Sequence, residues 1–258
     1  MKTIAIIGGG NMGEALIKGL TGHRLCVVEA NPSRAAYIKR TYNVTLTGIG
    51  DVVAQAEIVM FAVKPQDMGS ALREVGEAGR RLYISIAAGL TTRFFEKGLG
   101  GKARVVRCMP NMPGLIGEGI TGICKGQYAT AADLRTADGV LQSIGQTIVV
   151  KESLMDAVTA VSGSGPAYVF LFVEQWMAAA RAMGFSEQQA QTLVYKTLLG
   201  SAKLLQGSRL SAAELRAKVT SKGGTTQVAM DVFARRKFDQ LMKEALIAAC
   251  KRSKELAR

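Results

Sequence analysis

The chain has 258 residues, 48% of them hydrophobic, which suits a folded protein of two domains. Its longest apolar run, Pro166–Val173, stops at Glu174, short of the roughly 20 residues of a membrane-spanning helix, so we predict no membrane partner. The chain begins directly with a strand, so we predict no signal peptide. The net charge of +13 comes mostly from basic residues that stand singly in the sequence, and the chain has few aromatic residues, so we do not expect it to bind nucleic acid. The positive charge then forms either a solvated surface or an electrostatic field that attracts a small anionic substrate.

The first predicted element is a buried strand over residues 3–7, and a glycine-rich turn follows it at once. Gly8, Gly10 and Gly13 have the G-x-G-x-x-G spacing that binds the pyrophosphate of a dinucleotide at a helix N-terminus. In that motif the first glycine permits the turn, the second lets the backbone approach the phosphate, and the third lets helix and strand pack closely. A glycine-rich turn that serves packing alone is the alternative. The predicted strand over 25–29, which ends in Glu29, favours the dinucleotide.

The rest of the first half alternates between strand and helix patterns, which predicts a doubly wound, Rossmann-type α/β sheet over residues 1–150. Further strands are expected near 58–63, 82–86, 104–107, 120–124 and 147–150, and helices near 13–20, 33–42, 67–77, 91–97 and 130–144. Loops after the strands should share the carboxyl edge of that sheet. Four of these loops contain candidate residues: Ala30–Pro32, Val63–Pro65, Ala87–Gly89 and Met109–Asn111.

From residue 151 the strand signals disappear, which predicts an all-α domain over 151–258. Ser186 and Ser211 each begin a capping-box pattern. The stretch 167–183 is apolar nearly all round, so it should be buried, either within this domain or against a second copy of the chain. Helices are expected near 153–161, 166–183, 187–206, 211–218 and 223–255.

Two segments of this half place glycines and hydroxyl side chains at the start of a predicted helix. They are Val161–Phe170 and Val219–Met230, and such a segment can form an anion-binding nest of backbone N–H groups. A simple helix connection is the alternative for each. The four cysteines stand far apart without a Cys-x-x-Cys pair, so we expect no metal site and no disulfide, as in a reducing cytoplasm.

Six motifs together resemble the pyrroline-5-carboxylate reductase family in order and spacing, over essentially the whole chain. They are Gly8-Gly-Gly-Asn-Met-Gly13, Ala62-Val-Lys-Pro65, Ala87-Ala-Gly89, Met109-Pro-Asn111, Ser162-Gly-Ser-Gly-Pro-Ala-Tyr168 and Ser221-Lys-Gly-Gly-Thr-Thr226. The resemblance implies reduction of 1-pyrroline-5-carboxylate to L-proline by hydride from NADPH or NADH. It also implies a homodimer, or an oligomer of dimers, with interleaved helical domains.

The resemblance also assigns roles to individual residues. Thr226 would bond the ring nitrogen as the catalytic residue, and Ser221, Gly223, Gly224 and Thr225 would hold the substrate carboxylate. The cofactor would lie against the turn and the loops after later strands: Gly8, Gly10, Asn11, Met12, Gly13, Ala30, Asn31, Arg34, Ala62, Val63, Lys64, Pro65, Ala87, Ala88 and Asn111.

Departures from the family pattern bear on the cofactor. Many members have Ser-Asn-Arg after the second strand, whereas this chain has Ala30-Asn31-Pro32, so Arg34 would have to replace the missing arginine. Glu29 would favour NADH if it faces the ribose, while the family alone favours NADPH. A separate departure lies in the predicted substrate loop, where Lys222 stands at a position that is often proline in the family and adds positive charge near the substrate carboxylate.

Two other functions remain open at this stage. The first is a reductase of another cyclic imino acid or a hydroxyacid dehydrogenase-like enzyme, although Pro166–Phe170 lacks the lysine that such dehydrogenases use. The second is a dinucleotide-binding regulatory protein without turnover. A protonated cyclic imine needs no strong acid catalyst, which agrees with a chain whose only histidine is His23.

Overall fold

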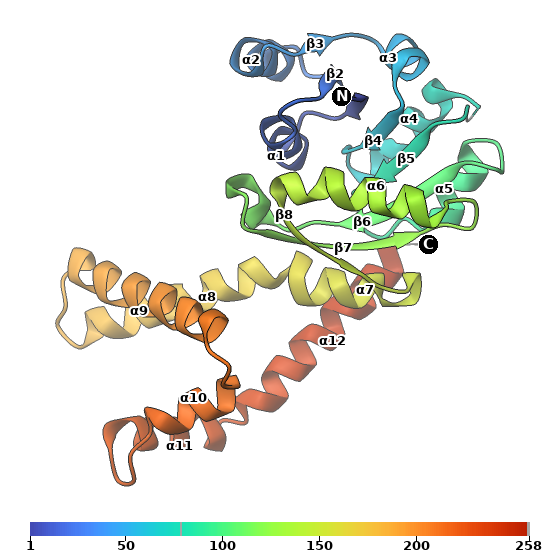
Figure 1. Cartoon of the computed structure of the whole chain (residues 1–258). Coiled ribbons are helices and arrows are strands. Elements are labelled where there is room, and N and C mark those ends of the chain that lie inside the picture. The colour runs from blue at the N-terminus through green and yellow to red at the C-terminus, as the bar shows by residue number, and fades with distance from the viewer. Residues whose placement is uncertain (78, 257–258) are drawn as a thin grey trace. The chain divides into compact units, whose positions relative to one another are not determined.

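The computed structural model describes residues 1–77 and 79–256. Eight strands form one sheet in the order β3-β2-β1-β4-β5-β6-β7-β8 (Figure 1). The strands are β1 Thr3–Ile7, β2 Arg24–Val28, β3 Thr45–Leu46, β4 Ile58–Phe61, β5 Leu82–Ser85, β6 Arg104–Met109, β7 Gly119–Lys125 and β8 Gly145–Val149.

Neighbouring strands pair in parallel from β3 to β6, and the strand order reverses direction between β1 and β4. This is the arrangement of a dinucleotide-binding sheet, whose ligand crevice opens at the carboxyl ends beside that reversal. β7 pairs antiparallel with β6, and β8 runs parallel to β7. The predicted fold class, a doubly wound sheet followed by helices, is therefore confirmed, with an antiparallel addition at one edge.

Helices cover both faces of the sheet. α1, α2 and α6 contribute to the core cluster on one face, and α3, α4 and α5 contribute to the cluster on the other. Alternate residues of β1 enter the two clusters, Ile4 and Ile6 the first, Ala5 and Ile7 the second. Burial on both sides explains why this strand is a continuous apolar run rather than an alternating one. The helices are α1 Asn11–Gly19, α2 Pro32–Tyr42, α3 Ile49–Gln55, α4 Met68–Val75, α5 Thr92–Gly98 and α6 Ala131–Leu141.

The second half is helical. Two capping boxes form as the sequence predicts, with Ser186 opening α9 and Ser211 opening α10. The elements are α7 Met155–Val158, a π-helical turn Thr159–Gly163, α8 Gly165–Ala182, α9 Glu187–Gly207, α10 Ala212–Lys218, α11 Thr225–Arg235 and α12 Phe238–Leu256.

Two compact units are present, and their bounds differ from a simple division into halves. The first unit comprises Met1–Pro166 together with Ala248–Arg258, and the second comprises Ala167–Ile247. In the first unit the last helical residues return to the sheet side, where the Ser253 hydroxyl donates a hydrogen bond of 2.8 Å to Asp156. A functional boundary at residue 151 stays a prediction.

Several predicted elements need correction. The two-residue strand β3 and the helix α3 were not predicted, because Gly48 and Gly50 stand where a helical signal would have to begin. The single helix expected over 223–255 is two helices, α11 and α12, since Lys237 adopts a left-handed φ of 53°. The helix expected over 130–144 ends at Leu141 and continues as a 3₁₀ turn.

The apolar helix α8 is not buried within one copy of the chain. Ala180 is its one buried residue, and Phe170, Leu171 and Phe172 are 58%, 57% and 44% exposed. The expectation that no segment is long and apolar enough to span a membrane is also wrong, because the helical run Glu152–Ala182 meets both criteria by length and composition. An exposed apolar surface such as that of α8 marks a site where another molecule binds.

Candidate active site

The glycine-rich turn between β1 and α1 lies at the reversal of strand order. Gly8 has a positive φ of 107°, and a Cβ atom there would meet the backbone of Ala62 at 2.7 Å. A Cβ on Gly13 would lie 2.1 Å from the carbonyl oxygen of Gly8. These two glycines are therefore required by the fold itself, for the left-handed turn and for the close approach of helix to strand.

Gly10 differs from its neighbours, since a Cβ atom there would meet nothing within 4 Å. Gly10 is also the N-cap of α1, so open space lies beside the free N–H groups at the positive end of the helix. An anionic pyrophosphate fits this cradle, because the space that a side chain would fill is the space that the phosphate needs. The turn therefore suits a dinucleotide by its geometry.

Alanine substitutions should separate these roles. We expect Gly13→Ala to destabilise the protein by about 2 kcal/mol through overpacking. Gly10→Ala should leave the urea midpoint nearly unchanged, because its φ of −63° suits alanine, while dinucleotide affinity falls about tenfold. Urea unfolding at a fixed protein concentration and fluorescence titration with NADH measure the two effects. A Gly10→Ala protein that binds NADH normally would contradict the phosphate role.

Most of the other predicted cofactor residues follow the carboxyl ends of β2, β4, β5 and β6, hence they lie along one edge of the sheet. Asn31 caps α2 by accepting from Arg34 N at 3.0 Å, and the Asn111 side chain accepts from Ile120 N at 3.0 Å. Lys64 is exposed, and Ala87 is buried. Asn11 and Met12 begin α1, Ala30 precedes α2, Ala62 and Val63 follow β4, Pro65 begins a 3₁₀ turn, and Ala88 follows β5.

Arg34 lies beside the turn within a network that the sequence did not reveal. Its Nε donates to the carbonyl oxygen of Gly9 at 2.7 Å, and its guanidinium forms an ion pair with Glu14. The hydroxyls of Tyr37 and Tyr42 donate to the same carboxylate at 3.0 and 2.6 Å. The Tyr42 hydrogen bond, with Arg34 and Tyr37, lowers the pKa of Glu14 below its ordinary value of 4.5. Glu14 therefore stays ionised and holds Arg34.

This network predicts a pH-dependent contribution to stability. A carboxyl whose pKa is lowered by folding stabilises the folded state above its unfolded pKa, and this stabilisation is lost as the pH falls through the folded value. Tyr42→Phe should therefore lower the free energy of unfolding by about 1 kcal/mol at neutral pH and by less in acid. Tyr37→Phe is the matched control with the longer bond, so it should have the smaller effect. Equal losses at neutral and acid pH would contradict the role of Glu14.

The predicted substrate residues lie in the second unit, at the start of α11. Gly224 is the N-cap, and its N–H donates to the Ser221 carbonyl oxygen at 3.0 Å. Gly223 has a positive φ of 72°. Ser221 and Thr225 are exposed, and Thr226 is half-buried. The segment is thus a tight turn that leaves backbone N–H groups and hydroxyls at a helix N-terminus, the arrangement predicted for an anion nest.

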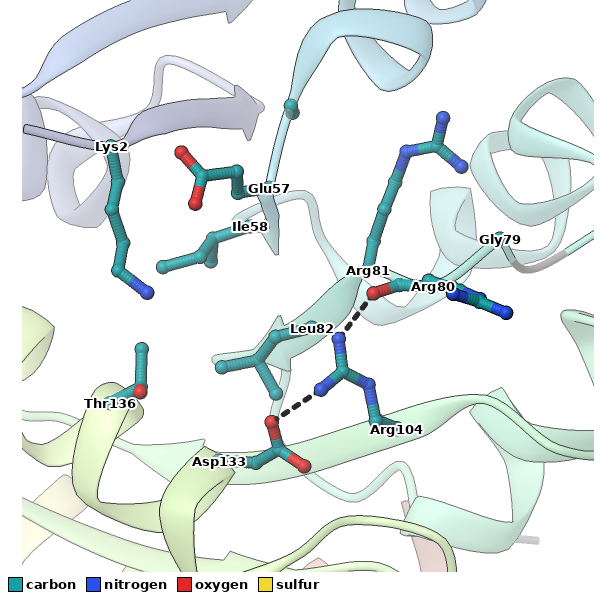
Figure 2. A pocket seen from close by; sticks show the side chains of 11 residues that line it. Lys2, Glu57, Ile58, Gly79, Arg80, Arg81, Leu82, Arg104, Asp133 and Thr136 are labelled. Atoms are coloured by element: carbon teal, nitrogen blue, oxygen red, sulfur yellow. Dashed lines mark hydrogen bonds and ion pairs between the residues drawn. The ribbon is translucent and has the colours of Figure 1, made fainter.

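The open pocket in Figure 2 is at the other edge of the sheet. Its volume is about 500 Å³, and its walls include Lys2, Glu57, Leu82 and Arg104, which precede or begin β1, β4, β5 and β6. His23 belongs to the same edge, because its Nδ1 accepts from Lys2 N at 3.3 Å. Ligands of open α/β sheets bind at the carboxyl ends, so neither the pocket nor His23 belongs to the dinucleotide site.

Comparison with known proteins gives matches over the entire chain. Residues 152–256 match the family model for pyrroline-5-carboxylate reductase dimerisation, and residues 3–89 match that for NADP oxidoreductase, coenzyme F420-dependent. A pyrroline-5-carboxylate reductase of Mycobacterium tuberculosis is 39% identical across 99% of this chain and 97% of its own length. The chain belongs to the pyrroline-5-carboxylate reductase family.

Solved structures of the family agree with this assignment. A pyrroline-5-carboxylate reductase from Coxiella burnetii superimposes with a TM-score of 0.92 at 33% identity, covering 100% of this chain and 99% of that one. The Plasmodium falciparum pyrroline carboxylate reductase, whose structure has NADP bound, gives a TM-score of 0.89 at 28% identity, covering 100% and 98%. The chain is thus an NAD(P)H-dependent oxidoreductase of this family, and its dimerisation region makes it self-associating.

Proposed function

We propose that the protein reduces 1-pyrroline-5-carboxylate to L-proline, the last step of proline biosynthesis. The observation that carries the proposal is the 39% identity to a pyrroline-5-carboxylate reductase over 99% of the chain. NADH or NADPH supplies the hydride. The predicted substrate is a small anion whose ring nitrogen, once protonated, already carries the positive charge that activates the neighbouring carbon.

The residues of the chain then have to position the reactants and exclude water. The turn at Gly10 holds the pyrophosphate at the N-terminus of α1, and the loops after β4, β5 and β6 line the same edge. The Ser221–Thr226 segment grips the substrate carboxylate with backbone N–H groups and hydroxyls, and the Thr226 hydroxyl bonds the ring nitrogen. This division assigns Thr226 as the catalytic residue.

Self-association is part of the proposal, in the form of a homodimer built on the helical region. The exposed apolar residues of α8, among them Phe170 and Leu171, supply a surface that a second protomer would cover. The helical run Glu152–Ala182 lies within the family's dimerisation region, so contact with a second protomer also explains why it has the length and apolar composition of a membrane-spanning helix. A cytoplasmic location and the absence of membrane, nucleic-acid and metal partners stay predictions.

The test compares three substrates with each cofactor. Oxidation of NADH and of NADPH is followed with 1-pyrroline-5-carboxylate, with the six-membered homologue piperideine carboxylate, and with a keto acid as the substrate of a hydroxyacid dehydrogenase. The proposal requires the highest kcat/KM on pyrroline carboxylate. A higher value on either other substrate would support the alternative reductases, and cofactor binding without turnover would support a regulatory protein.

A further inference from the structure

The Glu29 side chain holds a fixed position at the end of β2. One carboxylate oxygen accepts from Gly9 N at 2.8 Å, and the other accepts from Asn31 N at 2.8 Å. Both donors are main-chain groups, one in the phosphate-binding turn and the other at the start of the loop before α2. The carboxylate therefore cannot rotate away without breaking hydrogen bonds that order both segments.

A carboxylate held in this way still has acceptor capacity. Its two oxygens offer about four lone-pair sites, of which the two main-chain N–H groups use two. In a dinucleotide-binding sheet, an acid at the end of the second strand faces the adenosine ribose and accepts from its 2′-hydroxyl. Glu29 is at that place and is already oriented, so a ribose diol can bind without rearrangement of the side chain.

The cation that a 2′-phosphate would require is already engaged. Arg34 donates to the Gly9 carbonyl oxygen through Nε and pairs with Glu14, and its guanidinium carbon lies 5.1 Å from the centre of the Tyr37 ring. Glu14 keeps its charge because the tyrosine hydroxyls and Arg34 lower its pKa. Lys39 and Arg40 belong to the last turn of α2, whereas Asn31 caps its first turn.

Local charge therefore opposes a further phosphate. Of the three charged side chains in this network, Glu14 and Glu29 are carboxylates and Arg34 is the cation, so the network itself has more negative than positive charge. A 2′-phosphate would add more negative charge close to a carboxylate that cannot withdraw. A ribose hydroxyl instead donates to that carboxylate.

We propose that the adenosine end of this site selects NADH over NADPH, with Glu29 as the specificity-determining residue and Glu14 as the residue that withholds Arg34 from a phosphate. This inference rests on the proposed function, since it assumes that the turn binds a nicotinamide dinucleotide. It departs from the preference for NADPH that the family alone suggests.

Equilibrium binding tests the inference without any substrate. The dissociation constants of NADH and NADPH are measured by fluorescence titration for the unmodified protein and for Glu29→Gln. We expect NADH to bind the unmodified protein at least about tenfold more tightly, and Glu29→Gln to shift the ratio of the two constants about tenfold toward NADPH. The ratio of the two dissociation constants is the readout, because any disorder of the turn in the variant lowers the affinity for both dinucleotides equally.

Two further variants sharpen the result. Glu14→Gln should improve NADPH binding, because it releases Arg34, and should change NADH binding less. Glu74→Gln, which removes the same charge from an exposed position on α4, should leave the ratio unchanged. A ratio that moves equally in Glu74→Gln and Glu29→Gln would show a general effect of net charge and would overturn the proposal.

The outcomes also separate this inference from the proposed function. NADPH binding as tight as or tighter than NADH binding, with pyrroline carboxylate reduction intact, would overturn the selection alone. An unchanged ratio in Glu29→Gln would do the same. Failure of both dinucleotides to bind would overturn the proposed function and the inference with it.

Discussion

Thr226→Val should reduce kcat for pyrroline carboxylate by about 100-fold, while the dissociation constant of NADH stays within about twofold. Valine keeps the shape of threonine and removes the hydroxyl that the proposed mechanism directs at the ring nitrogen. Loss of one oriented hydrogen bond to a reacting group typically lowers turnover by about this factor. Cofactor binding should not change, because the dinucleotide turn belongs to a different part of the chain.

Thr192→Val provides the matched control. Thr192 is an exposed residue of α9 whose hydroxyl bonds to the Gln188 carbonyl oxygen at 2.9 Å, and no role in the site is proposed for it. Its turnover should equal that of the unmodified protein. If Thr226→Val retained full turnover, the ring nitrogen would have to be bound by another group, and the assignment of Thr226 would be withdrawn.

Arg107→Met should have the largest effect on stability, a loss of about 3 kcal/mol in the free energy of unfolding. Arg107 is 3% exposed on β6, and its guanidinium lies 3.6 Å from Glu152 and 3.7 Å from Asp156. Removing the cation leaves two partly buried carboxylates without their counter-charge, which is the costly way to break an ion pair.

The measurement is the urea midpoint at a fixed protein concentration, since self-association makes stability depend on concentration. Arg181→Met is the control, because Arg181 and Glu187 form a pair whose side chains are 53% and 63% exposed. We expect that variant to lose no more than about 0.5 kcal/mol. Equal losses of unfolding free energy in the two variants would mean that the burial of Arg107 does not increase the cost of removing its charge.

The glycine turn was predictable because its reasons are local. An apolar strand, three glycines at fixed spacing and a helix all lie within a short stretch. The spacing already implies the steric role of Gly8 and Gly13 in the turn and the open space beside Gly10. The strand after Asn111 was predictable as a strand but not in its direction. Antiparallel pairing of β7 with β6 follows from the tight 3₁₀ turn Met112–Ile116, for which only Pro113 and Gly114 give a signal in the sequence.

The network around Arg34 was not predictable, because its members are far apart in the chain. Glu14 is 20 residues from Arg34 and 28 from Tyr42, and no local pattern marks them as partners. Glu29 was recognised as a ribose candidate, but its bond to Gly9 N, which fixes its orientation, depends on how β2 lies beside β1. Likewise, the apolar character of 167–183 was evident, whereas the place of its burial was not.

The bond between Ser253 and Asp156 joins positions 97 residues apart, so the first unit includes a piece of the chain that is synthesised after the whole second unit. During synthesis, the sheet region leaves the ribosome first but lacks the Ser253 contact until the second unit has also been made. A nascent chain stalled before Ser253 therefore exposes the carboxylate of Asp156 without this donor. Chaperone binding or proteolysis at that stage would act on an incomplete first unit.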